Sequence, residues 1–285
     1  MKEGRRKGHS PSEVIRILRR RYPPVPDGRA DPFRTLIATV LSQRTREEKT
    51  AEAASALFSR FPDAASLATA SCAEVEPLIR PAGFYRQKAP TIIAIARLIA
   101  ERGGRVPDDM EGLLELPGVG RKTANCVLVF GFGIPAIPVD THVHRVSNRL
   151  GLVRTKTPEL TEEALTVSVP KRFWLDINEL LVPFGRELCR PIGPRCAECP
   201  LSRCPSRGKI KAGTRSGRAY APGLDSTILG GLGKALAGRP HRMARGKRRV
   251  EGNGQQAAGS REPTDANHRR NPAARCPLPA AGHDR

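Results

Sequence analysis

The sequence predicts an all-α protein. Apolar residues recur at helical spacing from residue 10 to about residue 205, and no segment there alternates in the manner of a half-buried strand. Signals that start helices precede several of these apolar runs. The body of the chain is therefore expected to consist of helices joined by loops.

The predicted helices follow one another in quick succession. The first begins with a capping box at Ser10 and Glu13, has a proline in its first turn, and places Val14, Ile17 and Leu18 on one face. A proline-rich linker over residues 22–31 ends it. The later apolar helical patterns lie near residues 33–41, 47–59, 73–79, 88–101 and 122–132.

Charge points to a polyanionic partner. The 285 residues carry a formal charge of +21, of which +12 lies from residue 205 onward and +9 on the body. Nucleic acid is the commonest partner of so basic a chain. A membrane is the rival, but no stretch approaches the roughly 18 apolar residues of a span, and no apolar signal region follows the first residues. These observations predict a cytoplasmic protein.

The last part of the chain differs from the body in composition. Residues 207–285 contain almost no large apolar side chains and many charged, glycine and proline residues. Such a segment cannot bury enough apolar surface to offset its conformational entropy, so it is expected to be a basic, disordered tail.

A glycine-rich turn separates two helical patterns in LELPGVGRKTANCVLVFGFG. Gly118 and Gly120 permit positive φ and leave no Cβ to block a close approach, while a helix opens at Arg121 with unpaired N–H groups. Together with Leu116 and Val119, these residues form a turn that suits a DNA phosphate and positions the protein without reading bases. An ordinary helix–helix turn is the alternative.

Lys122 and Asp140 are the candidate catalytic residues. Lys122 lies in the first turn of the helix after the glycine turn, where the helix dipole disfavours an ammonium, and a neutral amine is a nucleophile. Asp140 immediately precedes the helical segment THVHRVSNRL, so on its own it reads as an N-cap. His142 and His144 are expected at the surface or facing DNA, because no third metal ligand lies near them.

Four of the seven cysteines crowd into one short segment with the pattern Cys-x6-Cys-x2-Cys-x4-Cys. Crowding and the odd total argue against a disulfide framework and favour a metal site. Four thiolates suit an iron–sulfur cluster or zinc, and the spacing alone does not decide between them. Cys72 and Cys126 are expected to be buried small hydrophobes. The four clustered residues are Cys189, Cys196, Cys199 and Cys204.

The hairpin string, the IPVDTHVHRVSNRLGL segment, LSQRT at 41–45 and GFYRQKA at 83–89 together resemble the endonuclease III family of helix-hairpin-helix DNA glycosylases. The resemblance spans about residues 10–205. It implies a two-domain fold, with a helical barrel domain at 26–136 that carries the hairpin at about 113–132. The second domain, formed by residues 1–25 and 137–206, holds a 4Fe-4S cluster on the four cysteines. The final gap of the cysteine pattern is one residue shorter than in the family.

The resemblance also implies roles for single residues. Lys122 attacks the sugar C1′ of a flipped nucleotide and cleaves the strand by β-elimination through a Schiff base, while Asp140 stabilises the cationic sugar. Gln43 wedges into the space that the nucleotide vacates. Arg190 and Arg195, in the cysteine segment, contact DNA phosphate.

The predicted function is therefore bifunctional removal of oxidised pyrimidines from double-stranded DNA, with cleavage of the abasic site, by a monomer associated with the nucleoid. Three alternatives remain at this stage. A monofunctional glycosylase for mismatched thymine, uracil or adenine is disfavoured by Lys122. A non-catalytic DNA-binding or redox-sensing protein is disfavoured by Lys122 together with Asp140. A regulator with a zinc ribbon would need a groove-reading helix, which no segment marks.

Overall fold

The computed structural model describes residues 8–23 and 30–210, and its helical architecture confirms the predicted all-α fold class. None of the described residues is in a β-strand. The expectation of a disordered tail after residue 206 falls almost wholly outside them. The helices run in the order α1 (Pro11–Arg19), α2 (Pro32–Ser42), α3 (Glu47–Arg60), α4 (Ala64–Ala68), α5 (Cys72–Ile79), α6 (Tyr85–Glu101), α7 (Met110–Leu114), α8 (Arg121–Cys126), α9 (Thr141–Leu150), α10 (Pro158–Ser168) and α11 (Trp174–Glu187).

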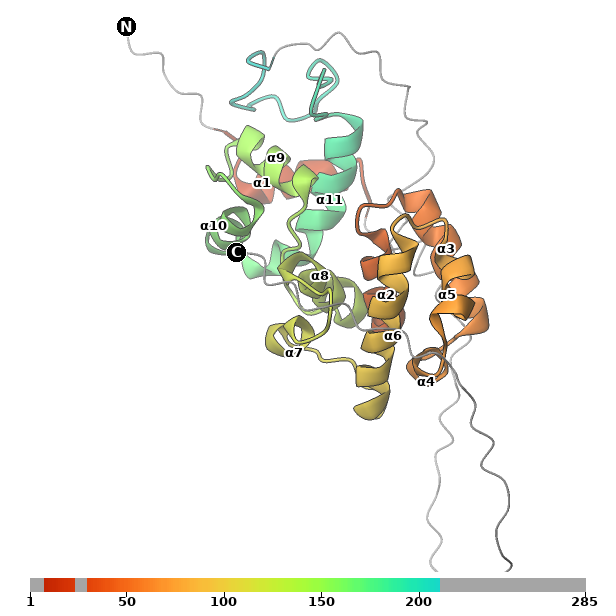
Figure 1. Cartoon of the computed structure of the whole chain (residues 1–285). Coiled ribbons are helices and arrows are strands. Elements are labelled where there is room, and N and C mark those ends of the chain that lie inside the picture. The colour runs from red at the N-terminus through yellow and green to blue at the C-terminus, as the bar shows by residue number, and fades with distance from the viewer. Residues whose placement is uncertain (1–7, 24–29, 211–285) are drawn as a thin grey trace, which may run out of the picture.

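One hydrophobic core joins the helices α2 to α8, which lie together in Figure 1. Helix α2 lies at its centre and buries eight of its eleven residues. Helix α6 packs most extensively against α4 and α5, and α2 packs against α3, α8 and the π-helical turn Val127–Phe132 that continues α8. A π-turn widens the helix locally and is often found at functional sites. Here it follows directly on the predicted catalytic helix.

A second core forms around α9 and α11, with α1 packed against α11 although the two lie far apart in sequence (Figure 1). Val14, Ile15 and Leu18 fill this core from α1, so Ile15 replaces the expected Ile17 on the most buried face. Ser10 and Glu13 form the predicted capping box. The two cores divide between Ala136 and Ile137, close to the boundary that the sequence suggests; the division into domains remains a prediction.

Ion pairs connect the two cores at two places. Arg121 at the start of α8 pairs with Glu162 on α10 at 2.7 Å, and Arg186 on α11 pairs with Glu47 at the start of α3. Each pair joins a partly exposed arginine to a largely buried glutamate, so the contacts fix how the two halves meet. They also flank the interior space in which the candidate site lies.

Candidate active site and cysteine loop

A cleft of about 740 Å³ opens between the two cores. Its walls come from α2, the turn that follows α2, α8 and the π-turn on one side, and from α9 and α11 on the other. Lys122 lines it from the first core and Asp140 from the second. The fold therefore brings the two candidate catalytic residues to one cleft, from opposite sides.

Lys122 is held at the mouth of this cleft by the hairpin. It is the second residue of α8 and is exposed. One helical turn further on, Cys126 is buried beneath it. Burial raises the pKa of the Cys126 thiol, a hydrogen bond with Lys122 opposes that rise, and the charge of Asp140 adds to it. The Cys126 thiol thus lies close enough to Lys122 and Asp140 for the charge of each to affect its pKa.

Asp140 is the N-cap of α9, as its position in the sequence predicts. Its Oδ1 accepts hydrogen bonds from the backbone N–H groups of His142 at 2.8 Å and Val143 at 2.7 Å. Both bonds go to the same oxygen, so Oδ2 takes no part in the cap. The cap fixes the carboxylate while one oxygen is left to act in the cleft.

His142 lines the cleft beside Asp140, whereas His144 faces away. Burial lowers the pKa of His142, the nearby Arg145 and Arg186 lower it further, and Asp140 opposes them. A guanidinium nitrogen of Arg145 lies 3.1 Å from His142 Nδ1, which suits a neutral imidazole that accepts a hydrogen bond there. His144 Nδ1 instead contacts the Thr161 hydroxyl on α10 at 2.6 Å.

The hairpin differs from its sequence-based description in one respect. Gly118 has φ +73°, and a Cβ there would lie 2.9 Å from a methyl group of Thr91. Gly120 does not adopt the positive φ that glycine permits: its φ is −97°, and a Cβ there would meet open space. Backbone geometry therefore requires glycine at position 118 only. Leu116 and Val119 anchor the turn in the first core, so only their backbone can face a ligand.

The turn after α2 brings Gln43 to the hairpin. Gln43 Nε2 donates to the carbonyl oxygen of Gly118 at 3.0 Å and lies 3.4 Å from the Thr123 hydroxyl. The Gln43 loop, residues 42–46, lines the cleft mouth through Gln43, Arg44 and Thr45. Arg121, by contrast, has its guanidinium engaged by Glu162, which raises its pKa.

The sequence did not single out two residues beside this loop. Phe84 is 53% exposed, has φ +57°, and lies under the guanidinium of Arg44, whose carbon is 5.9 Å from the ring centroid. Lys88 is buried and donates to the Gln43 loop. The only signal for either was their position in GFYRQKA, which gives no role.

The four clustered cysteines line one small cavity at the end of α11. All four carry free thiols and are partly buried, and none forms a disulfide. Burial raises the pKa of the Cys199 and Cys204 thiols, and the neighbouring cysteines add to that rise. Among residues 8–23 and 30–210, no three His, Cys, Asp or Glu side chains are arranged to hold a metal ion. A donor set that surrounds a cavity suits a cluster several atoms wide better than one ion.

Arginines from α9 donate hydrogen bonds to the cysteine loop, residues 188–206. Arg149 donates to the carbonyl oxygens of Arg190 at 2.5 Å and Pro191 at 2.9 Å, and Arg145 reaches those of Gly185 at 2.9 Å and Cys189 at 3.2 Å. Helix α9 thus begins at Asp140 in the cleft and ends on the cysteine loop. The two predicted sites share one element.

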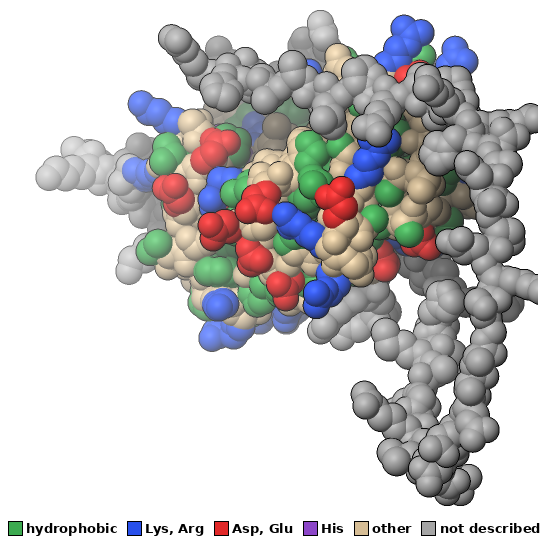
Figure 2. Space-filling model, turned by 60° about the horizontal axis from the view of Figure 1, so that its bottom comes forward, with side chains coloured by type: hydrophobic (Ala, Val, Ile, Leu, Met, Phe, Trp, Pro, Cys, Tyr) green, Lys and Arg blue, Asp and Glu red, His purple; other side chains and the backbone are tan. Residues whose placement is uncertain are grey.

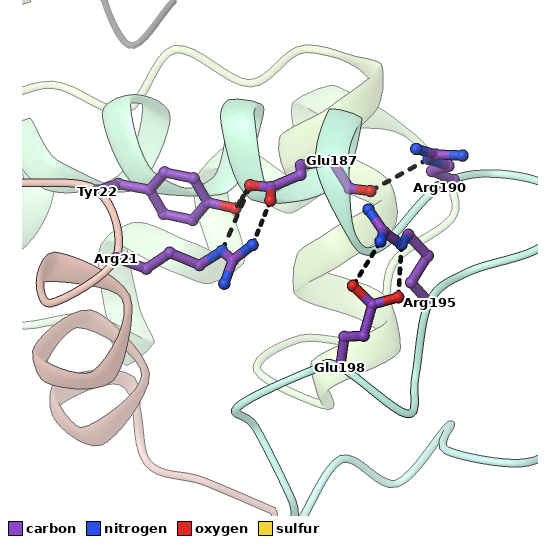
Figure 3. A network of polar contacts seen from close by, with 6 residues as sticks. All are labelled: Arg21, Tyr22, Glu187, Arg190, Arg195 and Glu198. Carbon is purple, nitrogen blue, oxygen red and sulfur yellow. Dashed lines mark hydrogen bonds and ion pairs between the residues drawn. The ribbon is translucent and has the colours of Figure 1, made fainter. Parts of the chain in front are cut away.

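The end of α11 is bonded both to the residues that follow α1 and to the cysteine loop, as Figure 3 shows. Glu187 accepts hydrogen bonds from Arg21 and from the Tyr22 hydroxyl, and its carbonyl accepts from Arg190 Nε at 3.1 Å. Arg195 pairs with Glu198 within the loop. Both arginines predicted to contact phosphate therefore already have an internal partner.

Acidic and basic side chains are interspersed where the described surface can be compared. Figure 2 looks onto the face at the bottom of Figure 1, where the visible acidic side chains lie among basic and apolar ones. A polyanion would meet repulsion as well as attraction there. The cleft lining is mixed as well, since Arg44, Lys122 and Arg186 lie there together with the acidic residues Glu47, Asp140, Glu159 and Glu179.

Comparison with known proteins identifies the class. Residues 37–171 match the family described as HhH-GPD superfamily base excision DNA repair protein. An endonuclease III of Thermotoga maritima is 53% identical over 190 residues, covering 66% of this chain and 89% of that protein, and one of Synechocystis is 42% identical over 200 residues, covering 68% and 91%. The chain belongs to the endonuclease III family of base excision repair DNA glycosylases and abasic-site lyases, which confirms the predicted family, fold and enzyme class.

Solved structures agree with this assignment. A trapped covalent intermediate of endonuclease III with DNA has a TM-score of 0.62 and 35% identity, covering 67% of this chain and 92% of that one. A thermostable thymine-DNA glycosylase has a TM-score of 0.57 and 27% identity, covering 68% and 92%. No helix in the described part of the chain is long and apolar enough to span a membrane.

Proposed function

We propose that this glycosylase and lyase removes oxidised pyrimidines from duplex DNA with Lys122 as its nucleophile. The observation that carries the proposal is the placement of Lys122 and Asp140 on opposite walls of one cleft, large enough for an extruded nucleotide. A lysine amine in such a cleft supports covalent chemistry, which a monofunctional glycosylase does not need.

The chemistry follows from these two groups. The Lys122 amine in its neutral form attacks C1′, and the C1′–N bond breaks with its electron pair leaving on the base. The Asp140 carboxylate stabilises the positive charge that develops on the sugar. Loss of a proton and ring opening give a Schiff base between Lys122 and C1′. Removal of a C2′ proton then expels the 3′ phosphate, which cuts the strand.

DNA contacts come from the cleft mouth. The Gln43 amide reaches the hairpin at the Gly118 carbonyl, near the exposed ring of Phe84, which supports the inference that Gln43 enters the space left by the flipped nucleotide. The backbone at Gly118 and Gly120 is available to a phosphate, because Gly120 has open space where a Cβ would lie. Arg190 and Arg195 are the predicted phosphate contacts of the cysteine loop.

The four cysteines would hold a 4Fe-4S cluster. Four free thiols around one cavity, with α9 arginines closing over the loop, fit that group. When bound, the cluster supplies four metal–thiolate bonds that fix the loop. Zinc would need the thiols to converge on one point, which the described cysteines do not do.

The proposed substrate is double-stranded DNA with a damaged base or an abasic site, bound by a monomer, and such a substrate places the protein with the nucleoid. Release of bases from a panel of duplexes tests the specificity. We expect thymine glycol and other oxidised pyrimidines to be excised, and mismatched thymine, uracil or adenine to be left. Selective release of the mismatched bases would favour the monofunctional alternative. Failure on every duplex would favour a non-catalytic protein.

A further inference from the structure

The GFYRQKA segment contains a buried cation whose partners lie in two separate turns. Lys88, in the first turn of α6, is 7% exposed. Its ammonium donates to the carbonyl oxygens of Leu41 at 2.7 Å and Gln43 at 2.7 Å, and to the Thr45 hydroxyl at 2.8 Å. The carbonyl of Ala82 lies further off, at 3.3 Å. Lysine is almost never buried unless paired, so these oxygens are the reason it can lie here.

Each of the two turns near the Lys88 ammonium contains a non-glycine residue with a strained, left-handed backbone. Among residues 8–23 and 30–210, Arg44 and Phe84 are the non-glycine residues with positive φ, at 53° and 57°. A non-glycine residue held in this region costs on the order of 1 kcal/mol or more and persists only where its surroundings fix it. The oxygens of Gln43 and Thr45 flank Arg44, and that of Ala82 lies two residues before Phe84. The ammonium therefore binds next to both strained positions.

The Gln43 loop lines the cleft, and the Phe84 turn, residues 82–84, presents a side chain against that loop. The Gln43 loop sends Gln43 to the hairpin, and the Phe84 turn exposes an aromatic ring beneath the guanidinium of Arg44. The three shortest contacts of the Lys88 ammonium go to the Gln43 loop and the end of α2, while Lys88 itself lies in the first turn of α6, for which Phe84 is the N-cap. The side chain therefore links the Gln43 loop to the Phe84 turn. Burial lowers the pKa of Lys88 to about 8, while the oxygen partners favour its charged form.

We propose that Lys88 is a positioning residue that holds the Gln43 loop and the Phe84 turn side by side, so that both enter the DNA at the flipped nucleotide together. This inference rests on the proposed function. Lys88 touches neither substrate nor reacting atoms in this arrangement. Lys88 affects base release by fixing the position of Gln43.

The test compares Lys88→Met, which keeps much of the side-chain volume and removes the ammonium, with wild type on two duplexes. One carries thymine glycol opposite 2-aminopurine, and the other carries a ready-made abasic site. We expect kcat/KM for base release to fall by about 10- to 100-fold, because misplaced groups far from the chemistry have effects of that size. Cleavage of the abasic duplex should fall by about threefold or less, since no base pair must be opened. The 2-aminopurine fluorescence that rises with wild type should rise less with the variant.

A double-mutant cycle with Gln43→Ala makes the test specific. If Lys88 acts through Gln43, then Lys88→Met should add little to the loss already caused by Gln43→Ala. Losses that multiply would overturn the proposal, as would an equal fall on both duplexes. Thermal unfolding and iron content are measured for each protein. Should Lys88→Met fail to fold, Thr45→Val removes a single acceptor and should show the same preference for the abasic duplex at smaller size. A wild type inactive on both duplexes would instead contradict the proposed function.

Discussion

The Gln43 loop and the cysteine loop are both held by cationic side chains that donate to loop carbonyls, but they differ in how many groups do the holding. One buried ammonium, Lys88, binds the Gln43 loop. Two guanidiniums from α9, Arg145 and Arg149, bind the cysteine loop, whose four thiols offer a further anchor. A loop with one anchor responds sharply to its loss, whereas a loop with several loses rigidity in steps. One substitution at Lys88 should therefore displace the Gln43 loop, whereas loss of one arginine should only loosen the cysteine loop.

The largest effect is expected when the thiol anchor is removed. Cys199→Ser should lower bound iron and reduce the free energy of unfolding by more than about 3 kcal/mol, because metal binding at a structural site is also folding free energy. Iron analysis and thermal unfolding measure it. Ser202→Ala, an exposed change in the same loop, is the matched control. Full iron content in Cys199→Ser would contradict the proposal that Cys199 holds the cluster.

Substitutions at the two hairpin glycines should affect different properties, stability at Gly118 and DNA affinity at Gly120. Gly118→Ala should destabilise by about 1–3 kcal/mol, because its φ is +73° and its Cβ would press on Thr91. Gly120→Ser has space for its Cβ at an N-cap position and should leave stability nearly unchanged, yet weaken DNA affinity if a phosphate approaches there. Chemical denaturation and DNA titration measure the two. Equal loss of stability in both variants would contradict the distinction.

Redundancy in the cysteine loop predicts a smaller effect from either arginine. Arg149→Met should lower the free energy of unfolding by about 1–2 kcal/mol through lost hydrogen bonds, and should speed iron loss to a chelator. Arg145→Met should act similarly, and the pair together should lose more than either alone. Exposed Arg16→Met serves as the control. Complete iron loss from either single variant would show that the loop has no redundancy.

The smallest effect concerns pH. Burial lowers the pKa of His142, so the folded state binds fewer protons than the unfolded state as pH falls below the ordinary histidine value of about 6.5. Stability should therefore decrease between pH about 7 and pH about 5, and His142→Gln should reduce that decrease. Unfolding midpoints of the two proteins across this range measure it. Parallel pH profiles would assign the acid sensitivity to other groups.

Much of the site could be predicted because its residues are local to motifs. The capping role of Asp140 and the helical position of Lys122 follow from a few neighbouring residues, and the structure shows both in one cleft. Lys88 could not be found in this way. A lysine in an amphipathic helix is usually solvated, and the burial of this one depends on two carbonyls 45 and 47 residues away in sequence.

The backbone conformation of several residues also could not be predicted from the sequence. Positive φ at Arg44 and Phe84 has no sequence signature, because neither residue type favours that region. At Gly120 the reverse holds: glycine suggests positive φ, and the chain adopts an ordinary N-cap conformation instead. The ion pair between Glu47 and Arg186 likewise depends on how the two cores meet.

Borohydride trapping tests the central claim that Lys122 is the nucleophile. The purified protein is incubated with a duplex bearing one abasic site or thymine glycol, borohydride is added, and wild type is compared with Lys122→Gln. Iron content and unfolding midpoint confirm that the variant is folded, as expected for an exposed side chain. We predict a covalent adduct and strand cleavage with wild type alone. An adduct of equal yield with the variant, or none with wild type, would contradict the assignment.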